Sequence, residues 1–205
     1  MRIFVGITGA SGSIYAQRLI QELLNIKVER IYVCASQTAK KVVAHELSTS
    51  KKFNTNNFCL KRLLQGVIND DHRKIIRIFD ADNFFAPIAS GSSAASHVIV
   101  IPCSMGSLAR IRCGTSSNLI ERSSDVSIKQ KKRLILCPRE TPFSTIHLEN
   151  MLALSKMGVD ILPPIPGFYQ KPQSLDDIVD FFIGKIFELL NLEHSLYRAW
   201  NKRLR

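Results

Sequence analysis

The chain has 205 residues, of which 45% are hydrophobic and 22% are charged, and its formal net charge is +11. This length and composition predict one globular domain with a sizeable core and exclude a disordered or collagen-like chain. No apolar run reaches the roughly 18 residues of a membrane span, and no charged start followed by an apolar stretch and a cleavage site indicates a secretory signal.

The first predicted element is a buried strand over residues 2–7, followed by the turn "TGASG" and a helical pattern from Ser13 onward. Glycines in such a turn permit positive φ and close approach of a ligand, and the start of a helix offers unpaired N–H groups. We therefore expect a nucleotide phosphate to lie against residues 9–12. The GxxGxxG spacing is also compatible with an ordinary tight turn.

The second predicted strand, residues 30–35, ends in Ser36 and Gln37. A dinucleotide-binding fold expects an acidic residue at this point, because it binds the ribose hydroxyls. Short-chain dehydrogenases need a Tyr-x-x-x-Lys pair, and no tyrosine of the chain is followed by lysine at that spacing. A mononucleotide such as FMN therefore fits the sequence better than NAD.

Further apolar runs at 97–102, 133–138 and 159–163, and a possible one at 75–79, predict more strands with helical patterns between most of them. Alternating strands and helices indicate an α/β fold with a parallel sheet covered on both faces. Four polar or glycine-rich segments follow strands: "TGASG", "SQT", "CSMGS" and "PRETP". Since ligands bind beyond the carboxyl ends of such strands, these segments predict the site.

The last predicted helix covers residues 175–190, with Ser174 as its N-cap and Asp177 at the capping-box position. Its apolar residues, among them Phe181 and Phe187, lie around much of its circumference and do not fit one face. We expect part of this helix to pack against another subunit; the alternative is a core helix covered on both sides.

The five cysteines are odd in number and never spaced as CxxC, which argues against a disulfide framework and a zinc cluster. Free thiols suit a reducing compartment, so a cytoplasmic protein is expected. The five histidines show no metal-ligand spacing, and we predict no metal site.

Six segments, taken in order, resemble the flavin prenyltransferases of the UbiX type, in the homo-oligomeric flavin-containing decarboxylase-like superfamily. They are "GITGASGSIYAQRL" (6–19), "ASGSS" (89–93), "IPCSMGSLARI" (101–111), "NLIERSSDVSIK" (118–129), "RLILCPRETPFSTIHLENM" (133–151) and "PPIPGFYQKPQSLDDIVDF" (163–181). The resemblance implies a Rossmann-like three-layer α/β/α fold with a doubly wound, mainly parallel sheet. It also implies one flavoprotein domain over residues 1–190 and a C-terminal tail helix over 191–205 that closes over the active site.

The activity that the resemblance implies is a metal-independent transfer of the dimethylallyl group from dimethylallyl monophosphate to reduced FMN, with release of phosphate. The product, prenylated FMN, then serves a partner decarboxylase of the UbiD type. Such enzymes form homo-oligomers, usually dodecamers, and act without nucleic acid or membrane. The sequence leaves open whether the donor is the monophosphate or the pyrophosphate, and which decarboxylase uses the product.

The resemblance also assigns site residues by motif. The FMN-contacting positions match Gly9, Ala10, Ser11, Ser36, Ser104, Met105, Gly106, Ser107 and Arg139. The positions around the dimethylallyl phosphate match Ser90, Arg122, Lys129, Glu140, Tyr169 and Lys185. The catalytic roles match Glu140, Glu46, Ser11 and Trp200. Lys185 stands where relatives carry arginine, which keeps the charge and loses the bidentate fork.

The chemistry of these residue types agrees with the implied roles. Ionising an allylic phosphate without a divalent cation requires protein cations, for which the candidates are Arg122, Lys129, Arg139 and Lys185. Glu140 is the candidate acid that protonates the departing phosphate. Trp200 is the only tryptophan, and its ring suits an allyl cation, since a desolvated cation–π contact is worth about 2 kcal/mol.

Alternative interpretations remain for the same residues and for the whole chain. Arg139 and Glu140 also fit a surface ion pair, and Trp200 a core or interface anchor. An FMN-dependent cysteine decarboxylase of the same superfamily would carry a Pro-x-Met-Asn-x-x-Met clamp, which "PRETPFSTIHLENM" lacks. The basic clusters at 129–133 and 198–205 raise a nucleic-acid-binding module, although no aromatic pattern or known motif accompanies them.

Overall fold

The computed structural model describes residues 1–26, 28–47, 63–64 and 71–198. The chain divides into two compact units, Met1–Pro163 and Pro164–Arg205. This division lies well before residue 190, where the sequence analysis expected the flavoprotein domain to end. Within the described residues, no helix has both the length and the apolarity needed to cross a membrane.

The first unit contains a single six-stranded sheet in which every neighbouring pair is parallel. The strands are β1 (Arg2–Ile7), β2 (Arg30–Ala35), β3 (Ile76–Asp80), β4 (His97–Cys103), β5 (Arg133–Pro138) and β6 (Asp160–Ile161). Their order is β3-β2-β1-β4-β5-β6, so the strands that follow β1 in the chain lie on both sides of it in the sheet. The predicted doubly wound sheet is confirmed, and its order reverses between β1 and β4.

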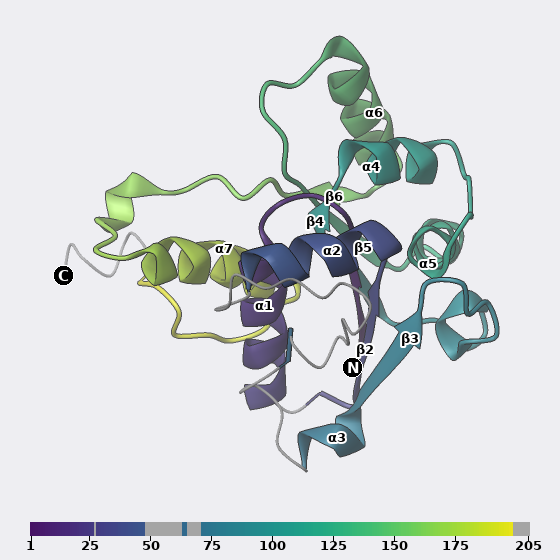
Figure 1. The fold of residues 1–205 in the computed structure, drawn as a ribbon, viewed down its shortest axis with the longest axis horizontal. Helices are drawn as coiled ribbons and strands as arrows, with labels where there is room; N and C mark the ends of the chain where they lie inside the picture. The colour runs from purple at the N-terminus through teal and green to yellow at the C-terminus, as the bar shows by residue number, and fades with distance from the viewer. Residues whose placement is uncertain (27, 48–62, 65–70, 199–205) are drawn as a thin grey trace. The chain divides into compact units, whose positions relative to one another are not determined.

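The helices of the first unit cover both faces of this sheet. They are α1 (Ser13–Asn25), α2 (Gln37–Glu46), α3 (His72–Ile75), α4 (Met105–Arg112), α5 (Leu119–Lys129) and α6 (Thr145–Lys156), with a 3-10 turn, η2 (Pro87–Ala89). Figure 1 shows α1 and α5 on opposite sides of the central strands. The three-layer arrangement predicted from the resemblance is therefore present.

Alternation along the central strands explains the two faces. On β1, Phe4 belongs to the same buried cluster as Ile120 of α5, while the neighbouring Ile3 and Val5 are also fully buried. Because successive side chains of a strand point to opposite faces, Ile3 and Val5 face the layer that contains α1. A strand buried on both faces needs a nearly continuous apolar sequence, and "IFVGI" supplies it.

The second unit contains a 3-10 turn, η3 (Phe168–Gln170), and one long helix, α7 (Leu175–Leu189). The predicted capping box is present: the Ser174 side chain accepts the N–H of Asp177, and the Asp177 carboxylate accepts the N–H of Ser174. The apolar residues of α7 are already buried in the single chain, with Phe187 at 1% exposure. The single chain therefore covers these side chains, as the core-helix alternative expects, and the packing of part of α7 against another subunit stays a prediction.

The predicted tail helix does not form in its described part, residues 191–198, where the chain makes turns and bends. Asn191 adopts a left-handed conformation with φ 55°, and the N–H of Leu192 donates to the carbonyl of Phe187 at 2.9 Å. This geometry ends α7 in a Schellman-type C-cap, because the left-handed residue turns the chain away from the helix axis. Residues 199–205 lie outside the described residues.

Candidate active site

The carboxyl ends of β1 and β4 meet at the point where the strand order reverses. Thr8, which follows β1 and is 2% exposed, joins them: its hydroxyl donates to the carbonyl of Pro102 at 2.8 Å and accepts the N–H of Ser104 at 2.7 Å. Parallel sheets bind ligands at this switch point, because the loops leaving the two strands diverge there.

A cavity of about 290 Å³ opens at the switch point. Its lining residues are Thr8, Gly9, Ser36, Thr38, Ser104, Ser107, Arg110, Asn118 and Ile120. Four predicted FMN contacts, from three different loops, are thus brought together: Gly9, Ser36, Ser104 and Ser107. The remaining predicted FMN contacts of these loops differ in exposure: Ala10 and Met105 are buried, whereas Ser11 and Gly106 are exposed.

Two helices begin at this cavity, each with a serine N-cap. Ser36 accepts the N–H of Ala39 in α2 at 3.1 Å, and Ser104 accepts the N–H of Ser107 in α4 at 3.3 Å. The Ser104 and Ser107 hydroxyls also lie 3.1 Å apart. Two helix starts that face one cavity give it a positive local potential, which favours an anion.

Gly9 is required by the close approach of two loops. A Cβ atom at this position would lie 2.5 Å from Cγ2 and 2.8 Å from Cβ of Thr38. Those distances are far below van der Waals contact, so a side chain here would push the loops after β1 and β2 apart. The glycine therefore allows the backbone itself to form part of the cavity wall.

The N-terminus of α1 is closed by a carboxylate from α2. Glu46 accepts the N–H of Ser13 at 2.7 Å and the N–H of Gly12 at 3.1 Å. Burial alone would raise the pKa of Glu46, but hydrogen bonds from Ser11, Ser13 and Gly12 outweigh burial and lower it. Glu46 and Ser11, which the resemblance assigned to catalysis, are thus brought together. The N–H of Gly12 donates to Glu46 and is therefore not free to bind a phosphate.

Arg110 is a cavity residue that the sequence analysis missed. Its Nε donates to the carboxylate of the buried Glu121 at 2.6 Å, and its Nη2 donates to the Ser107 hydroxyl at 3.3 Å. A usable signal was present in the sequence, since Arg110 follows Ser107 by three residues and a helix places such residues on one face. Asn118, also missed, caps α5 by accepting the N–H of Ile120 at 3.0 Å.

Arg139 and Glu140 follow β5 at the same edge of the sheet. The Arg139 N–H donates to the carbonyl of Cys103 at 3.2 Å, and the Nε of its side chain is buried without a hydrogen-bond partner. Glu140 is exposed, and its carboxylate accepts the N–H of Thr141 at 3.0 Å. Among the ion pairs of the described residues, none joins Arg139 to Glu140, so both side chains remain available to a ligand.

Arg122 lies beside the "ASGSS" segment, where its Nε donates to the carbonyl of Ala89 at 3.1 Å and its Nη1 contacts Asp125 at 3.1 Å. The next residue, Ser90, is exposed, and its hydroxyl lies 3.2 Å from that of Ser92. Lys129 ends α5, about 10 Å further along the helix at 1.5 Å per residue. Within one chain, Arg122 therefore contacts the residue before Ser90, whereas Lys129 lies about two helical turns after Arg122.

Lys185 and Tyr169 lie in the second unit, on either side of Phe181. The Lys185 ammonium is 5.6 Å from the Phe181 ring centre, and the Tyr169 ring meets Phe181 edge-on at 5.7 Å. Burial alone would lower the pKa of Lys185, but hydrogen bonds with Tyr197 and Glu188 outweigh it and raise the pKa. Lys185 is thus a firmly charged group within this unit.

Trp200, the predicted aromatic over the prenyl group, lies outside the described residues. The described tail is fastened at two places within the second unit: Tyr197 donates to the Glu188 carboxylate, and Gln170 donates to the carbonyl of Arg198 at 3.0 Å. The backbone just before Trp200 is therefore held beside the turn that carries Tyr169.

Cys34 and Cys103 end β2 and β4 at the same edge but do not provide nucleophiles. Both are buried, and burial raises the pKa of each thiol to about 12. They remain protonated at neutral pH and act as small apolar core residues. Within the part of the chain that the structure describes, no cluster of three or more His, Cys, Asp and Glu residues could hold a metal ion.

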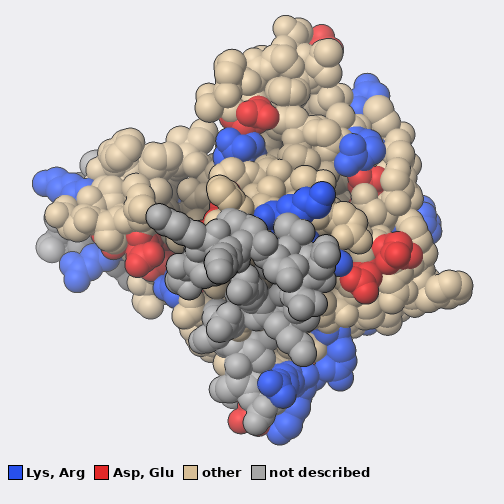
Figure 2. All heavy atoms as spheres, viewed as in Figure 1, with Lys and Arg blue, Asp and Glu red and all other residues tan. Residues whose placement is uncertain are grey.

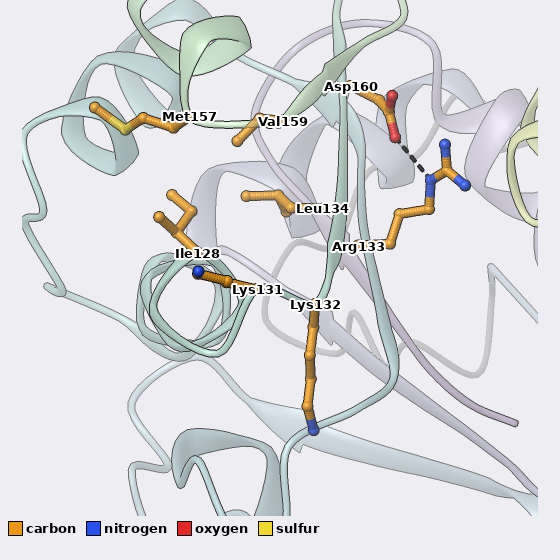
Figure 3. Close-up of a pocket in the computed structure, with 9 residues that line it drawn as sticks. Ile128, Lys131, Lys132, Arg133, Leu134, Met157, Val159 and Asp160 are labelled. Carbon is orange, nitrogen blue, oxygen red and sulfur yellow. Dashed lines mark hydrogen bonds and ion pairs between the residues drawn. The ribbon is translucent and has the colours of Figure 1, made fainter.

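A larger hollow, of about 480 Å³, lies at the opposite, amino-terminal edge of β5 and β6. Figure 3 shows its wall, in which Arg133 and Asp160 form an ion pair of 2.8 Å while Ile128, Leu134 and Val159 supply apolar surface. It contains no residue that the sequence analysis assigned to the site. The larger hollow is therefore not the candidate active site. The smaller cavity is the candidate, because residues from several loops converge there.

Figure 2 shows one face, on which basic and acidic residues are scattered among other residues and a group of Lys and Arg lies over α3 and the start of β3. Within the basic cluster at 129–133, Arg133 is paired with Asp160 and Lys132 donates to the carbonyl of Ala94 at 3.3 Å. This cluster does not form a continuous stripe of free cations.

Comparison with known proteins places this geometry in a family. A family model described as Flavoprotein matches residues 1–187. The flavin prenyltransferase UbiX of Halalkalibacterium halodurans is 43% identical, over 97% of this chain and 92% of the relative. A dodecameric FMN-dependent UbiX-like decarboxylase from Escherichia coli O157:H7 superposes with a TM-score of 0.84 at 36% identity, covering 98% of this chain and 99% of the other.

A second solved structure contains FMN and the pyrophosphate form of the dimethylallyl donor, one of the two donors that the sequence analysis left open. AnUbiX (PadA1), in complex with FMN and dimethylallyl pyrophosphate, superposes with a TM-score of 0.82 at 34% identity, over 97% of this chain and 96% of that one. These matches extend over nearly the whole chain, so the likeness includes every loop that forms the cavity. The chain belongs to the flavoprotein family and, within it, to the flavin prenyltransferases of the UbiX type.

Proposed function

We propose that this protein transfers a dimethylallyl group from a dimethylallyl phosphate to reduced FMN, producing prenylated FMN. The observation that carries the proposal is the cavity at the switch point, where Gly9, Ser36, Ser104 and Ser107 gather around two helix starts. The complex of AnUbiX with FMN and dimethylallyl pyrophosphate supports the same substrates for this chain.

The residues of the cavity fit the phosphate end of FMN. Gly9 lets the loops after β1 and β2 approach closely, so that its backbone lines the cavity. Thr38 and Ser107 are hydroxyl residues of the same lining. Such a lining offers hydrogen bonds to phosphate oxygens, and the two helix starts favour their charge. The backbone of residues 9–11 and 104–107 and the side chain of Arg139 would hold FMN, which when reduced supplies the nucleophile that accepts the dimethylallyl group.

The residues around the donor would divide two tasks. The unpartnered guanidinium edge of Arg139 would bind the negative charge of the departing phosphate. Glu140, exposed and bonded only to its neighbour's N–H among the described contacts, would deliver a proton to that phosphate. Within the first unit, Arg122 with Ser90 would bind the same phosphate; Lys185 and Tyr169, in the second unit, are the remaining positions that the resemblance assigns to it.

Glu46 and Ser11 would act on a proton beside the flavin. The lowered pKa of Glu46 keeps its carboxylate ionised at neutral pH, so it suits a base that accepts a proton better than an acid that gives one. Its contact with Ser11 gives a route for that proton through a hydroxyl.

The protein is a homo-oligomer in this proposal, and a dodecamer is the form we infer from the Escherichia coli relative. The resemblance assigns Lys129 to the same phosphate as Arg122, and it follows Arg122 by about 10 Å of helix in α5.

The product would pass to a UbiD-type decarboxylase, and we infer a cytoplasmic setting in which reduced FMN is available. The described cysteines, Cys34, Cys103, Cys113 and Cys137, are all free thiols, which suits that setting. An FMN-dependent cysteine decarboxylase is disfavoured, because the segment after β5 lacks the substrate clamp of those enzymes. A nucleic-acid-binding module is also disfavoured, because its binding surface would not require the switch-point cavity.

Two measurements on the purified protein test this function. A flavin spectrum that stays with the protein after incubation with FMN and removal of unbound FMN identifies a flavoprotein. A nucleic-acid-binding module would retain no flavin. Release of phosphate from dimethylallyl monophosphate, or of pyrophosphate from dimethylallyl pyrophosphate, should then depend on reduced FMN under anaerobic conditions. Release that proceeds equally without FMN would contradict the proposal, and comparison of the two donors would identify the substrate.

A further inference from the structure

Arg110 is the only residue with a formal charge among the nine that line the switch-point cavity. The others are hydroxyl residues, a glycine, an asparagine and an isoleucine. We propose that Arg110 binds the phosphate of FMN, and that the buried Glu121 is a positioning residue that aims its guanidinium. This inference rests on the proposed function, since it assigns the charge that recognises the phosphate of that cofactor.

The guanidinium of Arg110 is held at two of its three nitrogen atoms. Nε donates to one oxygen of Glu121 at 2.6 Å, and Nη2 donates to the hydroxyl of Ser107 at 3.3 Å. Nη1 lies over Gly106, at 3.4 Å from where a Cβ atom would stand. Among the hydrogen bonds of the described residues none involves Nη1, and the proposal assigns this donor to the phosphate.

Glu121 is itself fixed. It is 1% exposed, it lies in the first turn of α5, and its second oxygen accepts the N–H of Ser117 at 2.9 Å. A buried carboxylate is tolerated only when it is paired and hydrogen-bonded, and the helix start stabilises it further. Since Glu121 cannot move to solvent, the planar fork of Arg110 is held in one orientation rather than sampling many.

The location of Arg110 matches that of the hydroxyl donors. It is one helical turn after Ser107 in α4, and Ser107 is one turn after the N-cap Ser104, so all three lie on one face of the helix. A phosphate that accepted from Ser104 or Ser107 would therefore be within the same cavity as the guanidinium. Arginine suits such an anion because its fork offers parallel donors, which an ammonium does not.

A purely structural pair is the competing interpretation, in which Arg110 serves only to neutralise Glu121. That interpretation requires the ion pair but gives no reason for the guanidinium to line a cavity that has no other charge. The two interpretations differ in one measurable respect. A phosphate-binding arginine distinguishes FMN from riboflavin, which lacks the phosphate, whereas a structural arginine affects both flavins alike.

The test compares FMN and riboflavin affinities of the full-length apoprotein by quenching of flavin fluorescence. Replacing Arg110 alone would leave Glu121 buried and unpaired, so the main variant is the double change Arg110→Met with Glu121→Gln, which removes both charges. Arg110→Lys keeps the charge without the fork. Arg112→Met, at an exposed position of the same helix outside the cavity lining, is the matched control.

The double variant should weaken FMN binding by about tenfold to a hundredfold, the range for loss of a charged hydrogen-bond partner, and leave riboflavin binding unchanged. Arg110→Lys should give an intermediate loss, and Arg112→Met none. Parallel weakening of FMN and riboflavin, or no change in either, would overturn the role of Arg110 while leaving the proposed function intact. Failure of the unaltered protein to bind FMN would instead overturn the proposed function, and this inference with it.

Discussion

The Glu46 carboxylate and the backbone N–H of Ser13 form a hydrogen bond of 2.7 Å that closes the start of α1 from a different helix. Gly12, the residue at the N-cap of α1, has a left-handed backbone with φ 109° and no side chain to provide this bond. A remote carboxylate thus replaces a local N-cap, and it couples the end of α2 to the turn after β1.

Glu46→Gln should reduce stability and make stability less sensitive to acid. The pKa of Glu46 is lowered from its ordinary value of 4.5 in the folded chain, so the ionised carboxylate stabilises the fold above that pH, and the contribution is lost as the pH falls through the lowered pKa. At neutral pH the loss should be about 1 kcal/mol, as for a helix cap. Urea unfolding at neutral and acidic pH measures both effects; an acid dependence identical in the variant and the unaltered protein would contradict this account.

Gly9→Val should abolish FMN binding, because even a Cβ atom would lie 2.5 Å from Cγ2 of Thr38. The matched pair is Gly9→Ala and the double change Gly9→Ala with Thr38→Ser, which removes that methyl group and keeps the hydroxyl. Overpacking of this kind costs about 1–3 kcal/mol. Because Thr38→Ser removes the contact at 2.5 Å but keeps the Cβ atom at 2.8 Å, the double variant should recover part of the stability and of the FMN affinity. Equal FMN affinity in all four proteins, measured by fluorescence titration, would show that the loops tolerate a side chain here.

Glu140→Gln should lower the rate of prenyl transfer by roughly 10²–10⁴, the usual contribution of a general acid, while FMN and the donor still bind. The amide keeps the shape of the side chain and removes its transferable proton. Glu149→Gln, at an exposed position of α6, is the control. Turnover of the Glu140 variant at the unaltered rate would leave departure of the phosphate to the cations alone.

Leu152→Asp should convert the assembly into a smaller species in light scattering. Helix α6 exposes Ile146 at 66%, Leu148 at 53% and Leu152 at 57%, and an apolar surface of this kind on a member of an oligomeric family favours a subunit interface. Ser155→Asp places the same charge at another exposed position of α6 and should leave the assembly intact. An unchanged particle mass in the Leu152 variant would place the interface elsewhere.

The fold could be predicted from the sequence because its signals are local. The apolar strands, the Ser174 capping box and the polar segments after four of the strands depend on neighbouring residues. The structure has a strand in each predicted run, although β6 covers only Asp160–Ile161 of the predicted 159–163. For α7 the sequence left a core helix and a subunit contact open, because periodicity shows how much of a helix is apolar but not how many neighbours cover it. Asn191, which ends α7 in a left-handed turn, is the kind of C-cap that a helix pattern alone does not reveal.

The site was predictable only in part, for the same reason. The resemblance assigned Gly9, Ser36, Ser104 and Ser107 to FMN, and they line one cavity because each lies in a segment that follows a strand of the parallel sheet. The hydrogen bond from Ser13 to Glu46 joins residues 33 positions apart in the sequence, so no local pattern predicts it. Arg110 was missed because an arginine late in a helix is usually solvated, and only the buried Glu121 turns it toward the cavity.

The central claim is that this chain prenylates FMN, and mass spectrometry of the flavin tests it most directly. The unaltered protein is incubated without oxygen with reduced FMN and dimethylallyl monophosphate, and the flavin is then extracted and weighed. The account predicts a flavin heavier than FMN by one five-carbon prenyl unit, formed only when protein, reduced FMN and donor are all present and without added metal. Recovery of unmodified FMN alone, from protein shown to bind both FMN and a donor, would contradict it.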